Sequence, residues 1–340
     1  VVGDPGMAKS VLLSAAARLA LRGIKTDGTG ATGTGLTAAA VRDKEFGDGK
    51  WTIAPGAMVL ADLGFLAVDE FEKMGEEDRD KMHQALEQQK VNVTKAGINA
   101  VLNSRCALLA AANPKLGRFD RSTPVAAQIS LSPALISRFD LIFTIFDTPK
   151  EEEDRQVATH IMDSYGAVNG WGNNGGESME QLFTPPISKE LFRKYVAMAK
   201  RLKPQLGGEV RKKFTEFYIG LRRQAYGDDN APVPLTAREL DALVRLAQAR
   251  ARARLSDTIS EEDANDVIKL VTNCLKDVFV EPESGKLDVD WVNCGISKTN
   301  RDRALSVREI LIGLEKEYGV EVPIAEVLDR AEEEGMAREK

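Results

Sequence analysis

The opening stretch Val1–Ser10 (VVGDPGMAKS) constrains the fold more than any other part of the chain. Two valines lead into a Gly-Asp-Pro-Gly turn, and Lys9 and Ser10 then open a run with helical spacing. The backbone N–H groups of such a loop, with the positive end of the following helix, form a cradle for phosphates. Lys9 would reach the β- and γ-phosphates, and the Ser10 hydroxyl would bind Mg²⁺. The residues predicted to surround the phosphates are Asp4, Pro5, Gly6, Met7, Ala8, Lys9 and Ser10. A plain strand-to-helix turn is the alternative, because Ala8 stands where the general pattern has glycine.

Composition limits the class of protein. The chain has 340 residues, enough for two or three domains, and no apolar run long enough to span a membrane. With 2 histidines and 3 widely spaced cysteines, a zinc site is disfavoured and a reducing compartment is favoured. The net charge of −6 argues against a surface that is basic all over, but it allows lysines gathered in a channel. Since strands usually run to about five residues and only two valines precede the loop, we expect a piece of a larger protein.

The first part of the chain alternates buried strands with helices. Short apolar runs typical of buried parallel strands lie at 65–70, 106–112 and 141–146. Helical patterns lie at 10–22, 74–89 and 132–136, and the Gly/Thr-rich stretch 26–35 is predicted to be a loop. This alternation predicts a doubly wound α/β sheet. Asp69, Glu70 and Asn113 would then follow strand ends, where such sheets bind ligands.

Two hairpins are predicted within this part. Residues 91–103 alternate on both sides of Lys95-Ala96-Gly97, which predicts a β-hairpin with lysine at its tip. Gly47-Asp48-Gly49 lies between an aromatic residue and Trp51, and this pattern predicts a second hairpin tip at 46–51.

The later part has a different character. A Gly/Asn-rich stretch is followed only by helical patterns, and Ser260 with Asp263 marks a helix start. The helical patterns lie at 189–202, 208–225, 236–255 and 260–278. The predicted organisation is an α/β core at 1–165, a linker at 166–186, a helical domain at 187–278, a second linker at 279–305, and the start of a truncated winged helix at 306–340.

The acids and the amide at the strand ends suit nucleotide hydrolysis. This reaction needs a phosphate cradle, Mg²⁺, an oriented water and positive charge. Asp69 would hold Mg²⁺ through water, Glu70 would polarise the attacking water, and Asn113 would position it. The alternative is that the two acids cap the helix that follows them.

The order and spacing of several motifs resemble the AAA+ ATPase core of the minichromosome maintenance (MCM) replicative helicases. The motifs are GDPGMAKS (3–10), VDEFEKM (68–74), HQALEQQ (83–89), KAGI (95–98), AANP (111–114), SRFD (137–140) and LTAREL (235–240). The resemblance runs from Val1 to about Val278 and implies an αβα P-loop ATPase with a parallel sheet and a helical lid. This family also uses alanine at the position of Ala8.

The resemblance implies a role for each matching residue. In the nucleotide-holding half these are Lys9 and Ser10 of Walker A, Asp69 and Glu70 of Walker B, and Asn113 of sensor 1. Arg138 is similar to the arginine finger, Arg238 to sensor 2, and Gln88 to a glutamine near the γ-phosphate; in this family all three act on nucleotide held by the neighbouring subunit. One chain would then hold half of each active site. Without the resemblance, Arg138 would pair with Asp140, and Arg238 would lie on a helix face.

The resemblance also implies contacts to DNA. Lys95 would lie on the pre-sensor 1 hairpin and touch DNA phosphates in the channel of a ring. Residues 46–54 correspond to the helix-2 insert, where Lys50 and Trp51 are candidate DNA contacts, although Trp51 could instead be buried.

The sequence also supports predictions for three further residues. His83 is expected to be a structural histidine with a satisfied hydrogen bond, and Val157 or Ile161 to line an adenine pocket.

The favoured interpretation is an ATP-driven DNA helicase motor that works as a hexameric ring. It would use ATP and Mg²⁺, act on single- and double-stranded DNA without a membrane partner, and reside in an archaeal cytoplasm, or in the nucleus if eukaryotic. One alternative is a non-hydrolysing homologue that assembles on DNA; intact Lys9, Glu70 and Arg138 disfavour it. The other is a protein-remodelling AAA+ ATPase; the Lys95 hairpin and the lack of a Gly-Ala-Phe-Thr-Gly-Ala loop disfavour a transcription activator.

Overall fold

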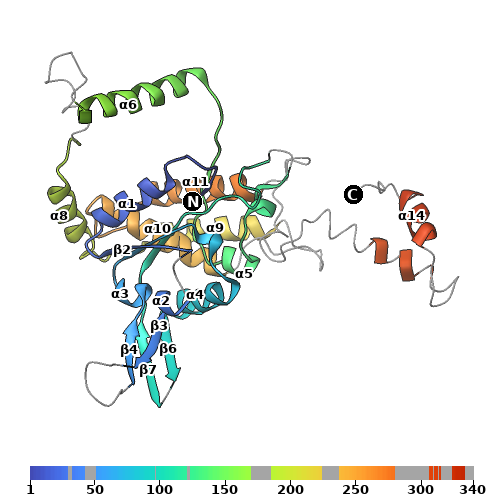
Figure 1. The fold of residues 1–340 in the computed structure, drawn as a ribbon, viewed down its shortest axis with the longest axis horizontal. Helices are drawn as coiled ribbons and strands as arrows, with labels where there is room; N and C mark the ends of the chain where they lie inside the picture. Colours follow the sequence, from blue (N-terminus) through green and yellow to red (C-terminus); the bar gives the residue numbers. More distant parts are fainter. Residues whose placement is uncertain are drawn as a thin grey trace.

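The computed structural model describes most of the chain. The described residues are 1–29, 33–42, 51–95, 97–120, 123–169, 185–223, 237–279, 306–308, 310–312, 314 and 324–333. Within them an α/β part comes first and a helical part follows (Figure 1). No helix in these ranges is long and apolar enough to cross a membrane.

A parallel sheet forms the centre of the α/β part. Strand β5 (Phe65–Asp69) pairs with β2 (Gly23–Asp27) on one side and β8 (Ala107–Ala110) on the other. Strand β1 (Val2–Gly3) pairs with β9 (Thr144–Ile145). A parallel bridge between Val2 and Ala112 joins the two groups. The resulting order is β2-β5-β8-β1-β9, which brings the ends of β1, β5 and β8 to one edge.

Alternation along β5 divides the core between the two faces of the sheet. Leu66 and Val68 are fully buried in the larger core, which also includes residues of α2, α3 and α4. Ala67 lies on the other face, against Leu13 of α1. Because side chains alternate along a strand, these contacts produce three layers, as the predicted αβα class requires. The helices of this part are α1 (Lys9–Leu19), α2 (Gly33–Leu36), α3 (Ala57–Leu60), α4 (Glu76–Gln88) and α5 (Pro133–Ile136), with 3-10 turns η1 (Phe71–Lys73) and η2 (Val125–Gln128).

Two antiparallel hairpins project side by side from one end of this part (Figure 1). Strands β6 (Lys90–Lys95) and β7 (Ile98–Asn103) pair with Lys95 opposite Ile98, so the hairpin predicted at 91–103 is confirmed. Gly97 has φ 83°, a left-handed conformation that favours glycine in the turn. Strands β3 (Ala38–Arg42) and β4 (Trp51–Pro55) form the other hairpin. Apart from Trp51, the tip predicted at 46–51 lies outside the described residues.

The helical part has its own core. Its helices are α8 (Lys189–Ala199), α9 (Gly208–Arg222), α10 (Ala237–Ala253) and α11 (Glu261–Phe279). Phe214 from α9, Ala247 from α10 and Val267 from α11 are buried together. Val278 at the end of α11 is instead buried in the larger core of the α/β part. One helix therefore joins the two parts. Further along, α14 (Ile324–Glu333) lies apart from both (Figure 1).

The stretch 26–35, predicted to be a loop, contains regular structure at both ends. Thr26 and Asp27 belong to β2, where they pair with Val68 and Asp69. Residues 33–36 form α2, whose Leu36 is fully buried. Pairing with β5 and burial of one leucine override the local Gly/Thr composition. The strand predicted at 141–146 is reduced to the two residues of β9.

Helix α6 (Glu151–Asn169) was not predicted, and its end enters the linker expected at 166–186. Four acids stand in its first turn, where they stabilise the positive end of the helix dipole. Val157 and Ile161 lie on α6 and are 58% and 45% exposed. Because α6 runs clear of the sheet (Figure 1), the expectation that these residues line an adenine pocket is wrong for this arrangement.

The start of α11 is a buried polar cluster. Asp263 donates its backbone N–H to Ser260 Oγ (3.2 Å), and Ser260 N–H donates to Asp263 Oδ2 (2.9 Å). Arg254 Nε donates to Asp263 Oδ1 at 2.9 Å. Burial raises the pKa of Asp263, but the hydrogen bonds from Arg254 and Ser260 outweigh it and hold the pKa at about 2. The helix start predicted from Ser260 and Asp263 is therefore confirmed, with two added arginines, since Arg250 Nε also lies 3.3 Å from Asp263 Oδ1.

Replacing Asp263 by alanine is expected to lower the free energy of unfolding by about 3 kcal/mol, because Arg254 loses its buried partner and α11 loses its cap. The depressed pKa gives a contribution that is complete above the ordinary value of 3.8 and is lost as pH falls towards about 2. Urea unfolding at neutral pH and near pH 2 measures this, with Glu262→Ala, the exposed neighbour, as the control. An equal difference between wild type and Asp263→Ala at both pH values would contradict it.

Candidate active site

The loop between β1 and α1 has the conformation of a phosphate cradle. Gly6 has φ 82° and Ala8 has φ 53°, both in the left-handed region. This explains why glycine is the general choice before Lys9, since alanine there costs about 1 kcal/mol. No side chain caps the start of α1, so N–H groups of its first turn remain for an anion.

Lys9 is buried beneath this loop. Its Nζ donates to the carbonyl oxygens of Gly3 (2.7 Å) and Asp4 (2.6 Å). Burial lowers the pKa of Lys9, and the carboxylates of Glu72, Asp4 and Asp69 offset part of that effect. The ammonium is therefore held against the carbonyl oxygens of the loop, which phosphate oxygens could replace.

The Asp4 side chain connects the loop to distant parts of the chain. Its carboxylate accepts the backbone N–H groups of Phe119 and Asp147, both at 2.8 Å. Its own N–H donates to Ile145 O at 3.0 Å. The Asp4 side chain therefore ties the loop to the segments that follow β8 and β9, and the phosphate contact expected of this residue stays a prediction.

Ser10 and Asp69 lie together, as a magnesium site requires. Burial raises the pKa of Asp69, but the hydrogen bonds from Ser10 and Lys25 outweigh this and lower it. Lys25 Nζ lies 3.2 Å from Asp69 Oδ2, so a cation already occupies the vicinity. Hydroxyl and carboxylate oxygens suit Mg²⁺, which keeps several of its waters. Among the residues that the structure describes, no cluster of three or more His, Cys, Asp or Glu side chains offers another metal site.

Glu70 follows in a left-handed conformation, with φ 49°. Non-glycine residues in this region are concentrated at functional sites. Its carboxylate accepts a hydrogen bond from Lys73 Nζ (2.7 Å) and another from Thr29 Oγ1 (3.0 Å). These two bonds, that of Lys73 above all, lower the pKa of Glu70. The two bonds therefore favour the ionised carboxylate, which is the form that a general base needs.

Asn113 is held by an acid that the sequence reasoning did not single out. Its Nδ2 donates to Glu72 Oε1 at 2.7 Å. Glu72 Oε2 is buried and has no hydrogen-bond partner among the described residues, as expected of an atom that a bound water or ligand would satisfy. Glu72 also raises the pKa of Lys9. The third acid in VDEFE, two residues after Glu70, was the available signal.

Arg138 and Arg238 gather around a different acid, Glu87 of α4. The Arg138 guanidinium lies 2.7 Å from Glu87 Oε2, and that of Arg238 lies 3.7 Å from Glu87 Oε1. Arg138 Nε also donates to His83 Nε2 at 3.0 Å, so the satisfied histidine that was predicted is confirmed. Asp140, the alternative partner of Arg138, pairs instead with Arg245 at 2.6 Å.

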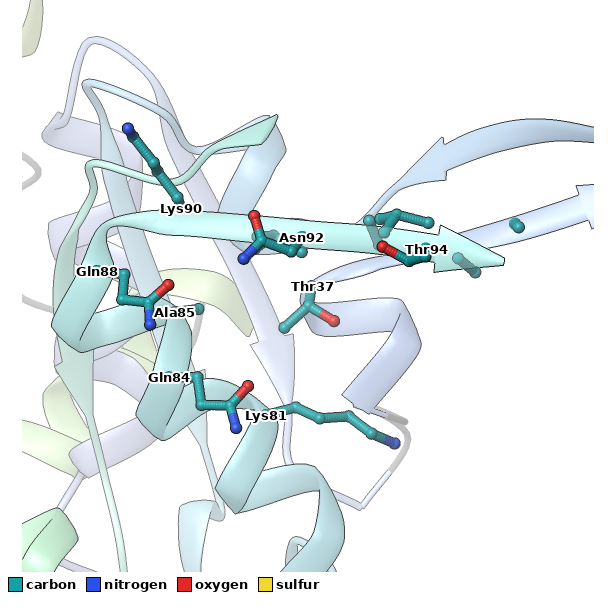
Figure 2. A pocket seen from close by; sticks show the side chains of 13 residues that line it. Thr37, Lys81, Gln84, Ala85, Gln88, Lys90, Asn92 and Thr94 are labelled. Atoms are coloured by element: carbon teal, nitrogen blue, oxygen red, sulfur yellow. The ribbon is translucent and has the colours of Figure 1, made fainter. Parts of the chain in front are cut away.

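Gln88 is adjacent to Glu87 but lies in another environment. It lines a groove between α4 and the bases of the two hairpins, shown in Figure 2. Gln84 also comes from α4, while Asn92 and Thr94 come from β6. The structure therefore does not bring Gln88 into the arginine cluster of its own chain.

The candidate DNA contacts lie on the two hairpins. Lys95 is the last residue of β6, next to the turn. Trp51 begins β4, is 39% exposed and packs under the Arg42 guanidinium at 5.4 Å, so the alternative of a buried Trp51 is wrong. Lys50 lies outside the described residues. Arg42, opposite Trp51 in the β3–β4 pairing, is a cation that the sequence reasoning overlooked.

Comparison with known protein families decides the relationship. Residues 1–165 match the MCM P-loop domain, and residues 190–275 match the MCM AAA-lid domain. The chain belongs to the MCM family. The resemblance inferred from the motifs and the AAA+ fold class that it implies are both confirmed.

Individual relatives of the chain agree with this family assignment. The MCM chain is 39% identical over 315 residues to the minichromosome maintenance protein MCM of Saccharolobus solfataricus, covering 92% of the chain and 44% of that protein. It is 37% identical over 336 residues to an uncharacterised MCM-type protein of Methanocaldococcus jannaschii, covering 98% and 47%. It is 34% identical over 342 residues to the DNA replication licensing factor MCM4 of Arabidopsis thaliana, covering 98% and 39%. The chain thus spans less than half the length of these relatives.

Proposed function

We propose that this MCM chain is the motor of a DNA helicase, which hydrolyses ATP at the interfaces of a hexameric ring. The observation that carries the proposal is the division of the predicted catalytic residues into two groups. One group surrounds Lys9, Asp69 and Glu70, and the other surrounds Glu87. Each group lacks what the other holds, since the first has the phosphate cradle and the second has the arginines.

The first group would bind and activate the nucleotide. Lys9 would exchange the loop carbonyls for β- and γ-phosphate oxygens. Ser10 and Asp69 would hold Mg²⁺, which neutralises phosphate charge when bound. Ionised Glu70 would accept a proton from the attacking water, and Asn113 would orient that water while its amide N–H₂ is held by Glu72.

The second group would act on the nucleotide of the neighbouring subunit. Arg138 and Arg238 carry two positive charges within reach of one carboxylate. Guanidinium groups in such a pair stabilise the charge that develops on the transferred phosphoryl group. In a ring, the phosphate cradle of every subunit would face Arg138 and Arg238 of a neighbouring subunit.

DNA is the proposed substrate of the motion. Relatives of this chain carry the name DNA replication licensing factor, which supports a role in replication. A ring would bring the Lys95 hairpin of every subunit to one level, and the gathered lysines would attract phosphates despite the net charge of −6. Single strands and duplexes both present such a backbone.

Replacing Lys95 by alanine tests this function. ATPase activity of the wild type is expected to rise with single-stranded DNA, and a forked duplex is expected to be unwound. Lys95→Ala should keep its activity without DNA, bind DNA about tenfold more weakly and fail to unwind, because it loses one phosphate contact per subunit. The control is Lys90→Ala, an exposed lysine at the other end of β6.

Two results would contradict the proposal. A wild-type ATPase rate that does not change when DNA is added would favour a protein-remodelling ATPase. Tight binding of Mg-ATP and DNA without any hydrolysis would favour a non-hydrolysing assembly protein.

A further inference from the structure

We propose that Glu87 is a positioning residue that sets Arg138 and Arg238 at a fixed separation before the neighbouring subunit presents its nucleotide. This inference rests on the proposed function, since it concerns the arginine-bearing half of the interfacial site. Glu87 is on α4, Arg138 follows α5, and Arg238 is in the first turn of α10. One carboxylate therefore joins three elements, one of which belongs to the lid.

Each oxygen of the carboxylate faces a different arginine, and Arg138 is the closer of the two. Glu87 Oε2 accepts a hydrogen bond from Arg138 at 2.7 Å, and Oε1 lies 3.7 Å from Arg238. Two guanidinium groups this close repel each other unless an anion lies between them. Glu87 supplies that anion, so its charge, and not only its hydrogen bonds, holds the arrangement.

The surroundings make Arg138 the rigid member. Its side chain is 11% exposed, against 36% for Arg238. His83 and Glu87 are four residues apart on α4 and therefore lie on one face of the helix, from which both contact Arg138. A guanidinium bound at two nitrogens by one helix keeps its orientation.

The lid joins through Arg238. Its guanidinium donates to the carbonyl oxygen of Ser137, the residue before Arg138, at 3.3 Å. Arg238 therefore contacts both Glu87 and the backbone that carries Arg138. Removing the charge of Glu87 would free the lid side of this contact and let the two arginines separate.

The steady-state test uses three variants. Glu87→Gln removes the charge at constant size, Glu87→Asp keeps the charge on a shorter side chain, and Glu77→Gln changes an exposed acid in the first turn of the same helix. We expect Glu87→Gln to lower kcat about tenfold with KM for ATP unchanged, because the bound ATP is held by the other group. The kcat of Glu87→Asp should lie between those of Glu87→Gln and the wild type, and the kcat of Glu77→Gln should match that of the wild type. A rise in KM without loss of kcat would overturn the proposal.

Mixed rings locate the effect. Glu87→Gln mixed with Glu70→Gln should regain activity, because an intact cradle then meets an intact arginine group. Glu87→Gln mixed with Arg138→Ala should not. The opposite pattern would assign Glu87 to the cradle. Failure of both mixtures, when Glu70→Gln mixed with Arg138→Ala is active, would reduce Glu87 to a general stabilising residue. Either result overturns the proposal.

A measurement on the unassembled chain separates this inference from the proposed function. Amide hydrogen exchange in residues 237–245 should be severalfold faster in Glu87→Gln than in the wild type or Glu77→Gln. If no mixture of variants hydrolyses ATP, the ring motor fails, and the exchange rate still decides whether Glu87 ties the lid. Unchanged exchange would overturn the inference.

Discussion

Replacing Arg138 by alanine is expected to lower ATP hydrolysis by about 10³-fold, while ATP binding to the same chain stays unchanged. Arg138 contacts Glu87 and His83, and the structure gives it no contact with Lys9, Ser10 or Asp69 of its own chain among the described residues. The variant therefore loses transition-state charge in the neighbour's site and keeps its own cradle. Phosphate release measures the rate, and a fluorescent ATP analogue measures binding.

The matched control is Arg245→Ala. Arg245 lies on α10 and pairs with Asp140. The substitution therefore removes an exposed arginine of the same region that is outside the Glu87 cluster. Its activity should remain within about twofold of the wild type, because exposed ion pairs contribute little. A loss of ATP affinity in Arg138→Ala that matches its loss of rate would contradict the account, since it would assign Arg138 to its own cradle.

Replacing Glu70 by glutamine is expected to lower hydrolysis by about 10²- to 10³-fold, because the amide cannot accept a proton from water. Glu70 is ionised and held by Lys73 and Thr29, and glutamine can keep the bond to Lys73 only in part. Binding of Mg-ATP should persist, since Lys9 and Asp69 are untouched. Phosphate release in a single turnover from bound ATP measures hydrolysis separately from the binding of Mg-ATP.

Glu76→Gln is the control for this change. Glu76 is an exposed acid at the start of α4, a short distance along the chain from Glu70. It should hydrolyse ATP like the wild type. Single-turnover release by Glu70→Gln at the wild-type rate would show that another group takes the proton, and Glu72 would then be the first candidate.

Much of the fold was predictable because its signals are local. The hairpin around Lys95 alternates with period two, and the lid helices have a period near 3.6 that survives in the structure. Strand β2 gave no such signal. Its sequence Gly23–Asp27 has one large apolar residue, and its conformation depends on pairing with β5, a partner more than thirty positions away. Helix α6 was missed although Val157 and Ile161 stand four residues apart in it, at helical spacing.

The site was predictable as a list of residues and unpredictable as a set of contacts. Lys9, Asp69 and Glu70 belong to motifs that are short in sequence. Arg138 reaches His83 and Glu87 across separations of 55 and 51 residues, which no local pattern encodes. For the same reason, nothing in the sequence indicated that the Asp4 carboxylate accepts hydrogen bonds from the backbone of Phe119 and Asp147, which lie more than a hundred positions away.

In the proposed function, complete active sites form only between subunits. The most direct test measures ATPase activity of equimolar mixtures of Glu70→Gln and Arg138→Ala chains, each nearly inactive alone. Some interfaces in a mixed ring would pair the intact cradle of one chain with the intact arginines of the other, so mixing is expected to restore a substantial part of wild-type activity. Mixtures no more active than the separate variants, under conditions where the wild type hydrolyses ATP, would contradict it.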